Sequence, residues 1–138
     1  MLYAPNADPA SRELRKATAF AAAIRKRIAA IEAGEPTSPL VELQGLRFGP
    51  FSLLGAPLEI FQAIKNDITN GAKSSVPLVL GLTNGDIGYA PDRTTAASGG
   101  RGGHTVDIVP LVVGEFPFKD IHTELVRELL ELDSSLIQ

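Results

Sequence analysis

Apolar residues recur at three- and four-residue spacing near the start of the chain, and this spacing predicts an amphipathic helix over residues 8–34. Asp8 can accept hydrogen bonds from the first free amides, Pro9 suits the first helical position, and Gly34 suits a left-handed stop. The apolar face consists of Leu14, Ala17, Phe20 or Ala21, Ile24, Ile28 and Ile31. We expect this face to pack against another part of the protein.

Basic residues fill much of the remaining surface of this first helix. They are Arg12, Arg15, Lys16, Arg25, Lys26 and Arg27. A charge-dense helix surface is usually solvated, and a phosphate-binding role is the alternative. The two prolines of "EPTSPL" then end the helix and indicate a short linker.

A β-hairpin is predicted over residues 40–57, because "VELQGLRF" and "FSLLGAP" flank the turn residues Gly49 and Pro50. Helical spacing returns in "LEIFQAIKNDITNGA" and predicts a helix over residues 58–71. Glu59 then lies at a strand-to-helix junction, where its carboxylate could simply complement the positive helix start.

The run "VPLVLGL" is continuously apolar, so residues 76–82 are expected to form a strand covered on both faces at the centre of the sheet. The region 83–103 shows no periodicity, and a connection of this length is usually functional or mobile. It contains "TNGDIGYAP", which puts Tyr89 just past the end of a strand, where folds often place their sites. A strand over 104–113 and a helix over 119–133, starting near Asp120, complete the chain.

This order of elements predicts a single domain, residues 1–138, of the α+β or mixed α/β class. A small sheet with a hairpin and a buried central strand would be packed by the long N-terminal helix, the middle helix and the C-terminal helix. The numbers of charged residues give a net charge of −3, so no overall positive field exists to hold nucleic acid or an anionic membrane. Absence of cysteine excludes disulfides and thiolate metal sites within the chain.

No apolar run has the length of a signal-peptide core or of a membrane span, and the compartment stays open. Spacing alone reveals no complete active site. The two histidines, His104 and His122, do not form a His-Glu-x-x-His motif, so His122 is expected at the surface and His104 remains a candidate ligand. The glycines of "SGGRGG" lack the lysine and helix of a phosphate loop, and no G-x-S-x-G motif occurs.

Three segments together resemble the last part of the catalytic domain of the neutral/alkaline ceramidases and their bacterial relatives. These are the strand pair leading into "LLGAPLEIF", the apolar strand leading into "GLTNGDIGYAP", and the following "SGG". The resemblance covers roughly residues 41–100. In that family a catalytic zinc is held by two histidines from earlier in the chain, a glutamate and a tyrosine. By motif position the glutamate corresponds to Glu59, in "APLE", and the tyrosine to Tyr89, in "NGDIGY".

The resemblance implies the C-terminal portion of a zinc-dependent amide hydrolase acting on N-acyl sphingoid or related lipids. Carboxylate and phenol oxygens both bind zinc, and a metal-activated water can attack an amide carbonyl. Glu59 and Tyr89 should then point into the same cleft, while loop residues Asn84, Arg101 and His104 are candidates for substrate binding.

The histidine-bearing region of the family has no counterpart in the chain. We therefore expect a fragment of a larger hydrolase domain, inactive alone, whose partner is that region in cis or in trans, and whose parent could be exported. The apolar surface left bare should drive homo-oligomerisation. The alternative is a non-catalytic binding or assembly module, in which Leu58, where the family commonly has glycine, and "GGRGG" mark the departure from the chemistry.

Overall fold

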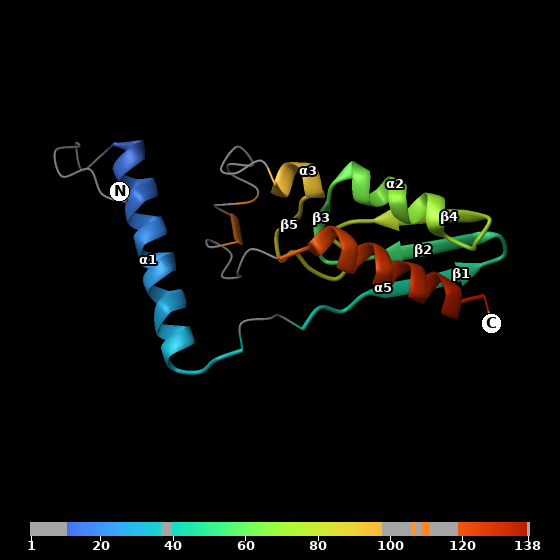
Figure 1. Ribbon diagram of the computed structural model, residues 1–138, viewed down its shortest axis with the longest axis horizontal. Coiled ribbons are helices and arrows are strands. Elements are labelled where there is room, and N and C mark those ends of the chain that lie inside the picture. The colour runs from blue at the N-terminus through green and yellow to red at the C-terminus, as the bar shows by residue number, and fades with distance from the viewer. Residues whose placement is uncertain (1–10, 37–39, 98–105, 107–108, 111–118, 138) are drawn as a thin grey trace.

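The structure, a computed structural model, describes residues 11–36, 40–97, 106, 109–110 and 119–137. Its described part has an α+β fold, as the sequence predicts (Figure 1). The elements are α1 (Arg12–Glu32), β1 (Gln44–Phe48), β2 (Phe51–Gly55), β3 (Glu59–Ile60), α2 (Gln62–Gly71), β4 (Val76–Leu80), β5 (Tyr89–Ala90), α3 (Arg93–Ala96) and α5 (Ile121–Ser135).

The main sheet has the strand order β1-β2-β4. The predicted hairpin is confirmed: β1 and β2 pair antiparallel around Gly49, whose φ of 56° is the left-handed conformation that glycine adopts readily. Strand β4 pairs parallel to β2, and α2 makes the crossover between them. The expectation that residues 76–82 form the central strand is wrong, because β2 occupies that position.

Helices α2 and α5 pack together and against one face of this sheet. The core between them includes Leu54, Leu58, Ile64, Ile68 and Leu129, all fully or almost fully buried. On β4 the exposure alternates along the strand, and Val76, Leu78 and Leu80 remain 36–42% exposed. Among the described residues, this continuous apolar run does not form a strand covered on both faces.

The first helix begins at Ser11, whose hydroxyl accepts a hydrogen bond from the Leu14 amide at 3.2 Å. Asp8 and Pro9, the expected cap and first helical position, lie outside the described residues. The stop at Gly34 is confirmed by its φ of 74°. No described helix or strand packs extensively against α1, and Ile28 and Ile31 are about half exposed. The expected burial of its apolar face does not occur within the described chain.

The middle helix starts later than expected, because Glu59 and Ile60 form β3 and pair with β5 instead of opening the helix. The predicted long loop also contains structure, since β5 and the short helix α3 lie within it. Asp92 caps α3 by accepting hydrogen bonds from the amides of Thr94 and Thr95. The strand predicted over 104–113 falls mostly outside the described residues, and its described positions, 106, 109 and 110, are helical.

The C-terminal helix is confirmed, with Asp120 as its cap. Within it, Asp133 is completely buried and joins three segments. Its carboxylate accepts hydrogen bonds from the Ser52 hydroxyl at 2.9 Å and from the amides of Lys73 and Ser74 at 2.7 and 3.1 Å. The hydroxyls of Ser52 and Ser74 lie 2.5 Å apart. This network fixes α5 to β2 and to the turn before β4.

Candidate functional site

Two very short strands bring Glu59 and Tyr89 together. Strands β3 and β5 pair parallel, with Glu59 opposite Tyr89. This pairing brings together two residues that are thirty positions apart in the sequence. The Glu59 amide donates to the Gly88 carbonyl at 2.8 Å, and the Phe61 amide donates to the Ala90 carbonyl at 3.1 Å. Side chains at paired positions lie on the same face of a sheet, so the carboxylate and the phenol project side by side.

The pair lies in one open pocket of about 320 Å³. Its walls come from β3, the start of α2, the residues after β4, and β5. The lining residues are Glu59, Ile60, Phe61, Lys65, Gly81, Leu82 and Tyr89. The ring of Phe61 meets that of Tyr89 edge to face, with centroids 6.1 Å apart and planes at 87°. This contact orients the tyrosine ring beside the carboxylate.

Glu59 controls the protonation of Tyr89. The negative charge of Glu59 is the main cause that raises the pKa of Tyr89 above its ordinary value, followed by desolvation, a hydrogen bond with Glu59, and the charge of Asp86. At neutral pH the phenol therefore keeps its proton and can donate it to a hydrogen bond with the carboxylate. Without a cation, the site disfavours a phenolate.

The glycines of "GLTNGDIGY" make this arrangement possible. A Cβ on Gly81 would lie 2.7 Å from the Leu58 carbonyl oxygen, so only glycine allows the chain after β4 to approach the segment before β3 so closely. Gly88 has a φ of 107° and donates its amide to the Asp86 carboxylate at 2.9 Å. The Ile87 amide donates to the Pro57 carbonyl at 2.9 Å. These contacts hold the loop that presents Tyr89.

Leu58, the residue before Glu59, points away from the pocket. It is 1% exposed and belongs to the apolar core, whereas Glu59 next to it lines the pocket. This is the alternation expected of neighbouring residues in extended chain. A leucine at this position therefore does not obstruct access to the Glu59 carboxylate. The helix-start role considered for Glu59 is wrong, because α2 begins three residues later.

Asn84, the one loop candidate for substrate binding among the described residues, does not lie at this pocket. Asn84 is exposed, with a φ of 58°, and its amide donates to the Glu42 carboxylate at 3.4 Å. Asn84 is not among the residues that line the pocket. Arg101 and His104 lie outside the described residues, so their roles stay predictions.

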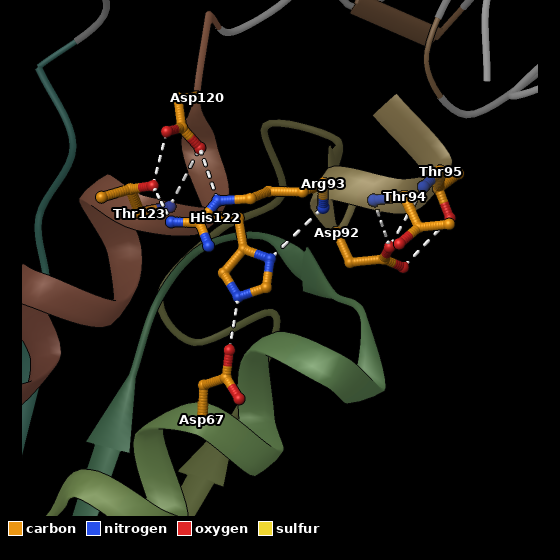
Figure 2. A network of polar contacts seen from close by, with 8 residues as sticks. All are labelled: Asp67, Asp92, Arg93, Thr94, Thr95, Asp120, His122 and Thr123. Atoms are coloured by element: carbon orange, nitrogen blue, oxygen red, sulfur yellow. Dashed lines mark hydrogen bonds and ion pairs between the residues drawn. The ribbon is translucent and has the colours of Figure 1, made fainter. Parts of the chain in front are cut away.

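His122 was expected at the surface, and this expectation is wrong. The side chain is 9% exposed, and both ring nitrogens have partners (Figure 2). Nε2 lies 2.8 Å from the Asp67 carboxylate of α2, and Nδ1 accepts a hydrogen bond from the Arg93 amide at 3.3 Å. Since Nδ1 accepts, Nε2 carries the proton toward Asp67. The position three residues before the buried Leu125 was the signal that could have indicated burial.

A second hollow, of about 440 Å³, lies on the other side of Tyr89. Apolar side chains from β5, α3 and α5 make up much of its wall, with Arg93, Lys119 and Asp120 among its polar residues. Figure 2 shows the Arg93 side chain directed toward Asp120 and Thr123. Hydrogen bonds from the hydroxyl and amide of Thr123 are the main cause that lowers the pKa of Asp120, and the charge of Arg93 adds to it. The nearest nitrogen and oxygen of the Arg93–Asp120 ion pair are 3.8 Å apart.

Among the described residues, no three His, Asp or Glu side chains gather closely enough to hold a metal ion. Glu59 and Tyr89 supply two oxygen donors in the pocket. No described helix combines the length and apolarity needed to cross a bilayer. The chain matches no protein-family model, no curated protein and no solved structure.

Proposed function

We propose that the chain is the C-terminal portion of a ceramidase-like, zinc-dependent amide hydrolase acting on N-acyl sphingoid or related lipids. The observation that supports this proposal is the Glu59–Tyr89 pair. The resemblance assigns both residues to one metal, and in the fold they lie opposite each other on β3 and β5 in one open pocket. Neither residue would be expected to meet the other from its distance along the chain alone.

The donor set fits part of a zinc site. A carboxylate and a phenol are hard oxygen ligands, and catalytic zinc commonly takes three protein ligands that include histidine. Zinc bound there would lower the pKa of a water molecule and polarise an amide carbonyl. The missing histidine ligands would come from another region, in cis or in trans, so this chain alone should be inactive.

The residues of this chain would position the substrate around that centre. Glu59 holds the phenol of Tyr89 in place, and the edge of Phe61 fixes the ring. The hollow of about 440 Å³ beyond Tyr89 offers apolar walls for a hydrocarbon chain, since Pro91, Ala96 and Ile121 line it. A lipid amide with its acyl chain in this hollow would present its polar part near Tyr89.

The alternative, a non-catalytic binding or assembly module, would keep the fold without zinc.

We expect the isolated chain to hold no stoichiometric zinc in elemental analysis and to release no fatty acid from N-acyl sphingosine. In the longest natural form of the protein, we expect one zinc per chain and amide hydrolysis. Glu59→Gln and Tyr89→Phe should each weaken zinc affinity at least about tenfold, as loss of one ligand from a small set does.

The exposed carboxylate of Glu42 supplies the matched control, because it lies in the chain before β1 and does not line the pocket. Glu42→Gln should leave zinc content and hydrolysis unchanged. A longest natural form that binds zinc equally well with and without Glu59 would sink the proposal and favour the assembly module. Tight one-to-one zinc binding by the isolated chain, abolished by replacing His104, would show that the site is complete without another region.

A further inference from the structure

One face of the main sheet is apolar and uncovered within the described chain. We call it the open sheet face, and it consists of Leu46, Phe48, Phe51, Leu53, Val76, Leu78 and Leu80. The pairing register aligns these side chains in rows across the strands, and the rings of Phe48 and Phe51 stack with centroids 5.3 Å apart. Leu46 and Phe48 are more than half exposed. Contiguous apolar patches of this kind usually mark an interaction site.

The apolar stripe of α1 is a second surface without an extensive partner. Ile28 and Ile31 are 48% and 51% exposed, and no described helix or strand packs extensively on α1. Figure 1 shows α1 beyond one end of the main sheet, joined to it by the chain that precedes β1. Leu40 in this connection is fully exposed. Among the described residues, α1 does not pack extensively on the main sheet.

The two surfaces match in length. Strands of five residues extend over about 16 Å, a distance that about eleven helical residues cover. The C-terminal half of α1, residues 22–32, has this length and carries Ile24, Ile28 and Ile31 on one side. These positions include the two isoleucines that are most exposed.

The two surfaces also belong to parts of opposite charge. Residues 12–32 contain six basic and two acidic residues, a net charge of +4. Residues 33–138 contain seven basic and thirteen acidic residues, a net charge of −6. Approach of α1 to the sheet-bearing body is therefore attractive, whereas stacking one open sheet face on another would bring two acidic bodies together.

We propose that the open sheet face binds α1 of a second copy of this chain, with the side of α1 that carries Ile24, Ile28 and Ile31 lying along the strands. The exchange is reciprocal, so a two-fold dimer covers both helices and both sheet faces. This inference needs neither zinc nor a substrate, and it stands independently of the proposed function. It assigns the expected self-association to two specific surfaces.

Mass measurement across a dilution series tests the dimer. Light scattering after size exclusion should give twice the chain mass of 14.6 kDa for the wild type. Ile28→Glu and Leu78→Glu should each raise the dissociation constant about tenfold or more, because each puts a charge into an apolar contact. Ala19→Glu is the matched control, since Ala19 is exposed on the opposite side of α1 and should not alter the mass.

Mixing the two defective variants separates exchange from other modes. The Ile28→Glu copy keeps an intact sheet face and the Leu78→Glu copy keeps an intact helix, so their mixture should form a heterodimer through one contact. Native mass spectrometry of copies that differ in mass would detect it, and circular dichroism would show that both variants fold. A wild type that is monomeric at every concentration overturns the proposal, as does sheet-on-sheet stacking, in which Ile28→Glu dimerises normally and mixing restores nothing.

Discussion

The phenol of Tyr89 and the carboxylate of Glu59 form a pair in which one charge controls a neighbouring proton. Because the Glu59 charge disfavours the phenolate, the pKa of Tyr89 is raised. A folded-state pKa above the unfolded value gives stability that is present below pH 10 and lost as the pH rises through the folded pKa. Tyr89 is accessible to solvent, so this contribution should be small. The pKa of Tyr89 is useful because it reports whether the Glu59 carboxylate lies beside the phenol.

Replacing Glu59 with glutamine should lower the pKa of Tyr89, because the largest cause of the shift disappears. Absorbance of tyrosinate during an alkaline titration measures the change, and Tyr89→Phe assigns the signal against that of Tyr3. Asp86→Asn is the control: its charge is the smallest of the four causes, so it should move the titration less. An unchanged titration in Glu59→Gln would mean that the two side chains are apart in solution.

The fold brings together the two residues that the resemblance singled out, whereas it buries a histidine that was expected at the surface. Glu59 and Tyr89 were singled out from "APLE" and "NGDIGY", and the fold places them side by side. Their metal-binding role stays a prediction. The burial of His122 depends on Asp67 and the Arg93 amide, which come from distant segments, and no local pattern records such partners.

Helix α5 is attached to the sheet by a buried carboxylate. Burial acts to raise the pKa of Asp133, but hydrogen bonds from Ser74, Ser52 and two backbone amides outweigh it and lower the pKa. A lowered folded pKa contributes stability that is present above the ordinary value of 3.8 and is lost as the pH falls through the folded pKa. The attachment of α5 should therefore weaken in acid.

Asp133→Asn should lower the free energy of unfolding at pH 7 by about 1–3 kcal/mol, since buried donors lose their charged acceptor. The variant should also lose less stability than the wild type between pH 5 and pH 2. Urea unfolding at a series of pH values measures both effects. Glu131→Gln on the same helix is the control, because Glu131 is exposed and should change stability little. Equal acid sensitivity of variant and wild type would contradict this role.

Elements with a local sequence signal could be predicted, whereas very short strands and pairings between distant segments could not. The spacing of apolar residues predicted α1 and α5, and the turn residues Gly49 and Pro50 predicted the hairpin, because each of these signals is local. Strands β3 and β5 have two residues each and exist only because they pair with one another. The exposed second face of β4 could not be predicted from "VPLVL", since an apolar run does not reveal whether that face is covered by this chain or by a partner.

At the scale of the molecule, the buried core of the described residues lies in the body that begins with the hairpin. Its residues extend from Leu54 to Leu129, with Leu43 packed at the margin, and none comes from α1. The helix therefore contributes little to the stability of that body. In the proposed dimer, α1 would instead contribute to the association of two copies of the chain.

Deleting residues 1–40 should leave a folded body whose thermal midpoint, measured in dilute solution where the full chain is monomeric, changes by no more than a few degrees. The reason is that none of the described residues in the deleted segment belongs to the core. Circular dichroism melting of both forms measures the change. A shortened chain that does not fold would show that α1 takes part in the core after all.

The Asp133 network also sets an order of events during synthesis. Its partner Ser52 is made 81 residues earlier and Ser74 59 residues earlier. At a synthesis rate of about 5–20 residues per second, roughly 4–16 s pass between the synthesis of Ser52 and that of its acceptor Asp133. During that interval the hairpin and β4 can pair on the ribosome, but the two hydroxyls and the face meant for α5 remain in contact with water. The nascent sheet therefore keeps this face exposed until α5 has been synthesised.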